Sequence, residues 1–318
     1  MALDAVVLQQ RIVYNRSHAG RLGVGTMATQ TDQVPNSAGT ARPKLHAPPG
    51  ACDCHMHVYD AERFPPSRPG SRMQANAGVA DYRRLQQRIG TTRTVVVQPA
   101  AYGTDNRVTL DAIAGLGNAR GVAVVWPDIG DGDLRVLDAG GVRGIRFTVF
   151  DPATAVTRID MIEPLARRMT DIGWHVQIHM RGDQIVANAD LLRRLPSTIV
   201  IDHMGRVPLT EGATHAAFGI VRELIDKGNT WVKLSGAYQD TRIGPPSYAD
   251  ATALARAYVA AARRGIRGPF AQKIEEQRVV GLVALGGMRP VAAPDDALRR
   301  RRILVDNPQA LYGFPPAA

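Results

Sequence analysis

The sequence is poor in cysteine and contains no long apolar run. Cys52 and Cys54 are the only cysteines among 318 residues. They cannot supply a disulfide framework or a structural zinc site of four cysteines, so we expect both to be reduced and buried. No segment approaches the roughly 18 apolar residues that cross a bilayer, and the first residues lack the apolar run of a secretory signal. We therefore expect a cytoplasmic protein.

Aromatic residues are also scarce, at 5%, and acidic residues are outnumbered, because 29 Asp and Glu face 39 Lys and Arg for a net charge of +10. A positive surplus can indicate a nucleic-acid or membrane partner when the basic residues are clustered. Here they are scattered, and the aromatics are too few to form a base-stacking surface. We expect neither partner. The charge instead favours a small anionic substrate, which it attracts electrostatically.

The first 48 residues lack sustained periodicity and are rich in Ser, Thr, Gln and Pro. Such a composition is typical of a disordered tail, which we assign to residues 1–48. Met27 would suit a natural start, which leaves open whether residues 1–26 are a genuine part of the protein. Residues 49–318 are assigned to a single domain.

From residue 51 onward, short β-branched runs alternate with amphipathic segments such as 158–173 and 216–229. Nearly continuous apolar runs suit strands that are buried on both faces of a parallel sheet. Seven such alternations predict an α/β fold of the (β/α)8 barrel type. An open doubly wound sheet is the alternative, but no GxGxxG turn follows any strand. The predicted strands lie within 51–57, 94–100, 121–127, 144–150, 174–180, 198–204 and 230–236.

Polar side chains gather at the carboxyl ends of the predicted strands, where a (β/α)8 barrel has its active site. His55 and His57, two positions apart on one strand, share a face and would project into the barrel mouth. Two imidazoles there can hold a divalent metal, or polarise a carbonyl without one. Locally hydrogen-bonded histidines are the alternative, which two further strand-end histidines disfavour. The strand-end set is His55, His57, Gln98, Arg146, His179, Asp202, His203, Lys233 and Ser235.

Arg146 belongs to the fourth predicted strand, and its guanidinium matches the geometry of a carboxylate. It can bind a substrate carboxylate or form a structural salt bridge, and the sequence leaves both open. The same strand has no lysine that could be carbamylated to bridge two metals. We therefore expect no binuclear metal site.

The motifs taken together resemble a known family. In chain order they are "DCHMHVYD", "VVVQPAAYGTDN", "GVRGIRFTVF", "VQIHM", "VIDHMGR", "WVKLSGAY" and "RRRILVDNPQALYGF". They are similar to motifs of the amidohydrolase superfamily, most closely its branch of 2-pyrone-4,6-dicarboxylate hydrolases and related lactonases. The resemblance covers residues 51 to about 262 and resumes at about 293. It implies a deformed barrel of the metal-dependent hydrolase type that opens the ester bond of a small anionic lactone, as in the breakdown of aromatic compounds.

The resemblance also implies roles for individual residues. Several members of the branch work without a metal and more distant relatives use one zinc, so the expectation is no cofactor, or a single zinc as the less favoured case. His55 and His57 would be its ligands. By matched motif the catalytic residues are His55, His57 and His203, which would polarise the lactone carbonyl, and the substrate-binding residues are Tyr102, Arg146, His179 and Arg242.

One region departs from the family pattern and affects the mechanism. The family has an eighth-strand motif similar to "GSDWPH", whose aspartate acts as general base or metal ligand, whereas residues 263–292 contain no aspartate. "RVVGLVALGG" can still form a strand, but it ends in Gly286 and Gly287, which cannot accept a proton. The loss and return of motif agreement suggests two compensating frameshifts in the coding DNA, and true divergence is the alternative.

Three functional hypotheses remain. The first is a lactone hydrolase whose activity is impaired by the missing aspartate. The second is a zinc-dependent decarboxylase or hydrolase of the same superfamily that acts on another substrate. The third is a barrel that binds ligands without catalysis, or a damaged copy.

Overall fold

The computed structural model describes residues 46–67, 76–244, 247–262, 279–281 and 294–316. Within these residues, eight strands form one sheet in the order β1 to β8, and each neighbouring pair is parallel. Each of the seven predicted runs overlaps one of the first seven strands. The strands are β1 Cys52–Met56, β2 Arg93–Val97, β3 Ala119–Ala123, β4 Val142–Thr148, β5 His175–His179, β6 Ile199–Ile201, β7 Thr230–Leu234 and β8 Val279–Gly281.

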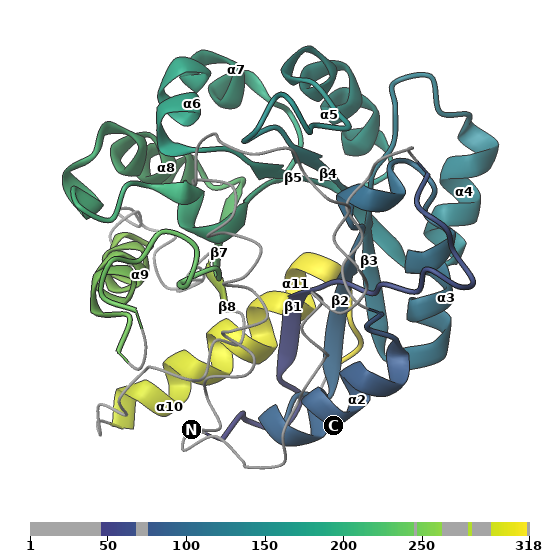
Figure 1. Ribbon diagram of the computed structural model, residues 1–318. Helices are drawn as coiled ribbons and strands as arrows, with labels where there is room; N and C mark the ends of the chain where they lie inside the picture. Colours follow the sequence, from purple (N-terminus) through teal and green to yellow (C-terminus); the bar gives the residue numbers. More distant parts are fainter. Residues whose placement is uncertain (1–45, 68–75, 245–246, 263–278, 282–293, 317–318) are drawn as a thin grey trace, which may run out of the picture.

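The sheet returns on itself, because β8 contacts β1 as well as pairing with β7. Figure 1 shows the strands around a common centre, with helices α2 to α9 outside them. This arrangement confirms the predicted (β/α)8 barrel. β8 falls within the "RVVG" segment that the sequence allowed as a strand, whereas Gly286, Gly287 and most of 263–292 lie outside the described residues.

Helices occur at the two segments where the sequence predicts them. The segment 158–173 contains the short helix η3 Ile159–Met161 and α5 Ile162–Asp171, and 216–229 contains α8 Ala216–Lys227. No described helix has the length and apolar character to span a membrane. The others are α2 Val79–Ile89, η2 Ala100–Tyr102, α3 Arg107–Leu116, α4 Asp131–Ala139, α6 Gly182–Ala187, α7 Ala189–Arg194, η4 Asp202–Arg206, η5 Gly212–Thr214, α9 Ala249–Ala261, α10 Pro294–Arg301, the π-helix η6 Arg302–Asp306 and α11 Asn307–Tyr312.

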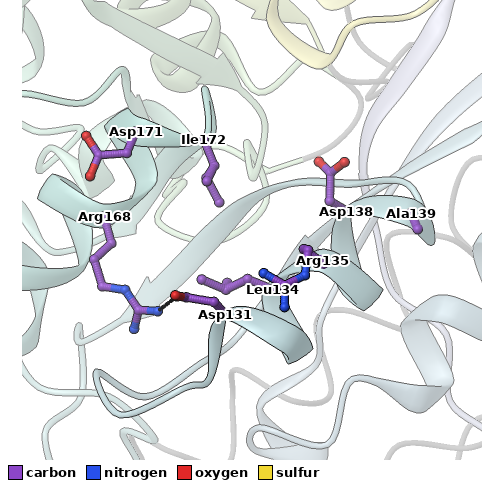
Figure 2. Close-up of a pocket in the computed structure, with 8 residues that line it drawn as sticks. All are labelled: Asp131, Leu134, Arg135, Asp138, Ala139, Arg168, Asp171 and Ile172. Carbon is purple, nitrogen blue, oxygen red and sulfur yellow. Dashed lines mark hydrogen bonds and ion pairs between the residues drawn. The ribbon is translucent and has the colours of Figure 1, made fainter.

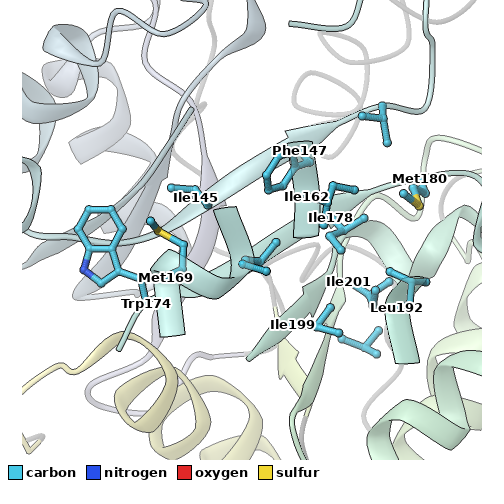
Figure 3. Packing of buried hydrophobic residues seen from close by; sticks show 14 of the residues in the cluster. Ile145, Phe147, Ile162, Met169, Trp174, Ile178, Met180, Leu192, Ile199 and Ile201 are labelled. Carbon is cyan, nitrogen blue, oxygen red and sulfur yellow. The ribbon is translucent and has the colours of Figure 1, made fainter. Parts of the chain in front are cut away.

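The main core lies between the outer face of the sheet and the helices. Successive residues of a strand point to opposite faces, so alternate residues of β4, β5 and β6 face the helices. Burying each large apolar side chain contributes about 1.5–3 kcal/mol. Figure 3 shows the side chains packed here, among them Ile145, Phe147, Ile162, Met169, Ile178, Leu192, Ile199 and Ile201.

A second cluster joins the first strands to the end of the chain. Cys52 and Cys54 are buried and free, as expected, and pack in this cluster with Trp231 of β7 and Tyr312 of α11. Phe314 follows α11 and belongs to the same cluster. The C-terminal helices therefore stabilise the interior of the barrel.

Candidate active site

A bulge in β1 positions the first two histidines. The register of β1 against β2 shifts between Asp53 and Met56. Asp53 accepts hydrogen bonds from the Tyr82 hydroxyl of α2 at 3.0 Å and from the backbone N–H of His55 at 3.0 Å. The extra residue of a bulge re-aims the side chains that follow it. Burial raises the pKa of Asp53 to about 6. Asp53, which the sequence did not mark, thus fixes the backbone that carries His55.

The structure brings the four predicted histidines together. The ring centroid of His55 lies 5.0 Å from that of His57 and 4.7 Å from that of His203. The ring of His179 lies 4.9 Å from that of His203. Burial lowers the pKa of all four, to about 4 for His57 and about 3 for His203. These imidazoles are therefore neutral at neutral pH.

A left-handed turn orients His203 at the end of β6. His203, Met204, Gly205 and Arg206 have φ values of 49°, 57°, 70° and 45°. Left-handed backbone is unfavourable for residues other than glycine, and such strain gathers at functional sites. The turn places His203 Nδ1 2.8 Å from the hydroxyl of Ser235. The orientation of this imidazole is thus set by both backbone and side-chain contacts.

Asp202 is fully buried beside the histidines and is surrounded by positively charged and hydrogen-bond donating groups. One of its oxygens accepts hydrogen bonds from Arg146 Nε at 2.9 Å and from the Gln177 amide at 3.0 Å. The other lies 3.4 Å from His55 Nδ1 and 3.8 Å from Lys233 Nζ. Burial opposes ionisation of Asp202, but Arg146, His55 and Lys233 outweigh it and hold the pKa well below its usual range.

Arg146 therefore forms a buried salt bridge, one of the two arrangements that the sequence left open. It also contacts the group of histidines, because its Nη2 lies 3.3 Å from His179 Nδ1. Asp202 and Lys233 belong to the predicted strand-end set, but the sequence assigned neither of them a role. Gln98 points elsewhere, since its amide binds the carbonyl oxygens of Gly103 and Asp105.

Tyr102 lies outside the histidine cluster. It is buried in η2, and its hydroxyl accepts a hydrogen bond from the backbone N–H of Asp60 at 2.9 Å. Its ring is 6.3 Å from that of Tyr59, which lies 6.3 Å from the ring of His57. Tyr59 thus neighbours both Tyr102 and the histidine cluster.

Arg242 is exposed on the segment after β7, where its backbone N–H donates to the Asp250 carboxylate at 2.9 Å. Arg206 instead reaches the cluster, with its Nη1 3.4 Å from His179 Nε2. Asp240 holds that guanidinium through two hydrogen bonds of 2.5 and 2.7 Å. The sequence reasoning missed Arg206, although its place directly after "DHMG" was an available signal.

A groove on the outside of the barrel is separate from this cluster. It has a volume of about 560 Å³ and lies between α4 and α5, where Arg168 pairs with Asp131 at 2.7 Å (Figure 2). Its lining contains none of the four histidines. The groove is therefore separate from the candidate active site at the barrel mouth.

Comparison with known proteins agrees with the fold. The sequence model of the family described as "Amidohydrolase" matches residues 52–266. The chain belongs to the amidohydrolase family. The match begins at β1 of this amidohydrolase and ends close to residue 262, where the resemblance in the motifs ends.

Curated relatives of this amidohydrolase match over most of their length. A 2-pyrone-4,6-dicarboxylate hydrolase of Comamonas testosteroni is 32% identical, over 86% of this chain and 94% of the relative. A 4-sulfomuconolactone hydrolase of Rhizobium radiobacter is 32% identical, over 84% and 91%. A D-galactarolactone isomerase of Agrobacterium fabrum is 31% identical, over 90% and 98%.

A solved structure from Agrobacterium tumefaciens superposes with a TM-score of 0.72 at 26% identity, and covers 88% of this chain and 99% of that chain.

Proposed function

We propose that this amidohydrolase hydrolyses the ester bond of a small lactone that carries an anionic group, such as 2-pyrone-4,6-dicarboxylate. The observation that carries the proposal is the cluster of buried, neutral imidazoles beside Arg146 and Arg206. The names of two relatives support it, because one specifies a dicarboxylate and the other a sulfomuconolactone.

The guanidinium groups of Arg146 and Arg206 border the cluster and can bind an anion. The contacts of His179 add a second reason. A neutral imidazole has one N–H and one acceptor nitrogen. His179, which faces a guanidinium at each nitrogen, can therefore accept from only one. The other guanidinium retains a donor for a substrate carboxylate.

The proposed reaction needs donors for the carbonyl oxygen and an acceptor for the proton of water. We assign His55 and His203, whose rings are 4.7 Å apart, to the carbonyl oxygen. Preorganised donors stabilise the oxyanion that develops, and loss of one typically slows a reaction by about 10²–10³-fold. Both imidazoles are held by neighbours, so little reorganisation is required when the substrate binds.

His57 has the geometry of the acceptor that the missing aspartate would otherwise provide. Its Nδ1 lies 2.7 Å from the carbonyl oxygen of Val97. A carbonyl oxygen only accepts, so Nδ1 carries the hydrogen and Nε2 carries a lone pair. With a pKa of about 4, lowered by burial and by Arg146, His57 is about as basic as an ordinary aspartate at about 3.9. We therefore assign His57 as the general base.

The donor set also raises the question of a metal. Donor atoms of His55, Asp202 and His203 lie within 4.8 Å of one another, and a catalytic zinc is commonly held by three such ligands. However, Arg146 and Lys233 already place two positive charges on Asp202, one at each oxygen. A divalent cation would be repelled by both. We therefore propose catalysis without a metal.

The test is hydrolysis of 2-pyrone-4,6-dicarboxylate by the purified protein, with ring opening followed by chromatography. The dimethyl ester of the same lactone is the matched uncharged substrate. We expect turnover of the dicarboxylate, slower turnover of the ester, and no loss of rate after dialysis against a chelator. A second version carries G-S-D-W-P-H at the eighth strand, and we expect it to be faster.

Absence of turnover in both versions would overturn the proposal and leave a barrel that binds ligands without catalysis. The second candidate function is a zinc-dependent decarboxylase or hydrolase of another substrate. Zinc retained in a 1:1 ratio after dialysis, with activity that depends on it, would favour this function. Its support in the structure is the same set of three donors.

A further inference from the structure

Lys233 is a fully buried lysine in the interior of the barrel, and the proposed reaction gives it no direct part. Its ammonium lies 2.9 Å from the carbonyl oxygen of Cys54 and 2.6 Å from Gln177 Oε1. It lies 3.4 Å from His55 Nδ1. A buried lysine without partners would be strongly unfavourable. These three contacts come from β1 and β5, so strands on either side of the interior hold the ammonium in place.

The contacts of Lys233 select one tautomer of His55. An ammonium group has three hydrogens and no acceptor. The Cys54 carbonyl, Gln177 Oε1 and His55 Nδ1 use all three in hydrogen-bond geometry. Asp202 Oδ1 lies 3.8 Å from Lys233 and 3.4 Å from His55 Nδ1, so it competes with Lys233 for that nitrogen. The ammonium cannot accept a hydrogen from Nδ1, so its contact favours Nδ1 as an acceptor and places the hydrogen of the neutral ring on Nε2.

His55 Nε2 is buried, and no hydrogen-bond partner for it exists in the described part of the chain. A buried N–H group without a partner is costly, so such groups are rare unless a ligand completes them. We propose that Lys233 is a positioning residue that holds His55 as the Nε2–H tautomer, so that His55 donates to the carbonyl oxygen of the bound substrate. The identity of that acceptor rests on the proposed function, whereas the tautomer does not.

The two histidines of the H-x-H pair then have opposite roles. The contact of His57 Nδ1 with the Val97 carbonyl leaves His57 Nε2 as an acceptor. The contact of His55 Nδ1 with Lys233 leaves His55 Nε2 as a donor. In the reaction, the oxygen of water bonds to the carbonyl carbon while His57 Nε2 takes one proton. His55 donates to the oxyanion. When the ring C–O bond breaks, His57 returns the proton to the leaving ring oxygen, and Lys233 transfers nothing.

Loss of Lys233 makes the opposite tautomer favourable. His55 Nδ1 lies 3.4 Å from Asp202 Oδ1 and can then donate to it, because Lys233 no longer donates to that nitrogen. The proton would move to Nδ1, and Nε2 would present a lone pair to the substrate. A lone pair repels a developing oxyanion. Lys233→Met should therefore lower kcat by about 10²–10³-fold, the cost of losing one oxyanion donor, with little change in KM.

The decisive experiment measures the tautomer directly by 15N NMR of the protein labelled at histidine. A His55→Gln variant assigns the signals. We expect the Nε2–H form of His55 in the wild-type protein and the Nδ1–H form in Lys233→Met. Lys227→Met is the matched control, because Lys227 at the end of α8 is exposed and donates to the Arg193 carbonyl on the outside of the barrel. It should change neither the tautomer nor kcat.

An Nδ1–H form in the wild-type protein, or an unchanged Nε2–H form in Lys233→Met, would overturn the inference. If Lys233→Met does not fold, the wild-type spectrum still decides between the two tautomers. The NMR signal needs no substrate. A protein that shows the expected tautomers but opens no lactone would overturn the proposed function and leave the role of Lys233 in orienting His55 intact.

Discussion

Arg146 of β4 and Asp202 at the end of β6 form an ion pair of 2.9 Å inside the barrel, with their side chains 6% and 0% exposed. Removing two charges from water is expensive, and their mutual attraction offsets that cost only while both are present. The pair therefore makes each residue dependent on the other. It also holds Arg146 beside His179, where a substrate anion would bind under the proposed function.

We expect Arg146→Met to lower the free energy of unfolding by about 3–5 kcal/mol, because it leaves the Asp202 carboxylate buried without its main counter-charge. Arg158 is the matched control, since it forms a pair of the same length with Asp160 on the surface. Arg158→Met should cost much less, because water screens this exposed pair. Urea unfolding measures both. Equal losses in the two variants would contradict the prediction.

His57→Gln tests the assignment of the general base. We expect kcat/KM for the anionic lactone to fall by about 10²–10⁴-fold, the usual contribution of general-base catalysis. His215→Asn is the control, because His215 only caps α8, where its Nδ1 accepts from the Ala217 N–H at 3.1 Å. Asparagine is also a good N-cap. Wild-type turnover by His57→Gln would show that another group accepts the proton.

Gly144 of β4 has no room for a side chain, since an added Cβ would lie 2.4 Å from the ring of His175. Gly144→Ala should therefore destabilise the protein by about 1–3 kcal/mol through overpacking. Gly219 lies within α8 and faces open space. Gly219→Ala should stabilise by about 0.5–1 kcal/mol. Thermal unfolding of the two variants checks whether the signs are opposite, and a shift of the same sign in both would refute the packing argument.

The buried histidines predict that stability falls in mild acid. The pKa is lowered mainly by burial to about 3 in His175, about 3 in His203 and about 4 in His57. In the unfolded chain these groups bind protons below about pH 6.5. The unfolded state is therefore favoured as the pH falls from about 6.5 to 4. The melting temperature should fall from pH 7 to pH 4.5.

Asp53 acts in the opposite direction within that window. Burial raises its pKa to about 6 in the folded protein, so the folded state binds a proton below pH 6 while an unfolded aspartate remains charged to about pH 4. One aspartate offsets only part of the effect of three histidines. Asp53→Asn should therefore steepen the loss of stability with falling pH. A shallower loss in this variant would contradict the assignment.

The sequence by itself determined the barrel and most members of the site. Short β-branched runs between amphipathic helices specify parallel strands, and a barrel brings their carboxyl ends together. This is why His55, His57, His179, His203 and Arg146 were found from their places at strand ends. These residues come together because of the barrel topology. That topology follows from the alternation of strands and helices along the whole chain.

Only the tertiary structure decided how these groups are arranged. The bulge between Asp53 and Met56, the left-handed turn at His203 and the contact of Lys233 with His55 depend on register and on distances between strands. Arg206 reaches His179, whereas Arg242 is exposed, and local periodicity cannot distinguish these outcomes. The tautomer of a buried imidazole is set by which atom lies beside each nitrogen. Such neighbours are remote in sequence, because Lys233 and His55 are brought together by the closed sheet alone.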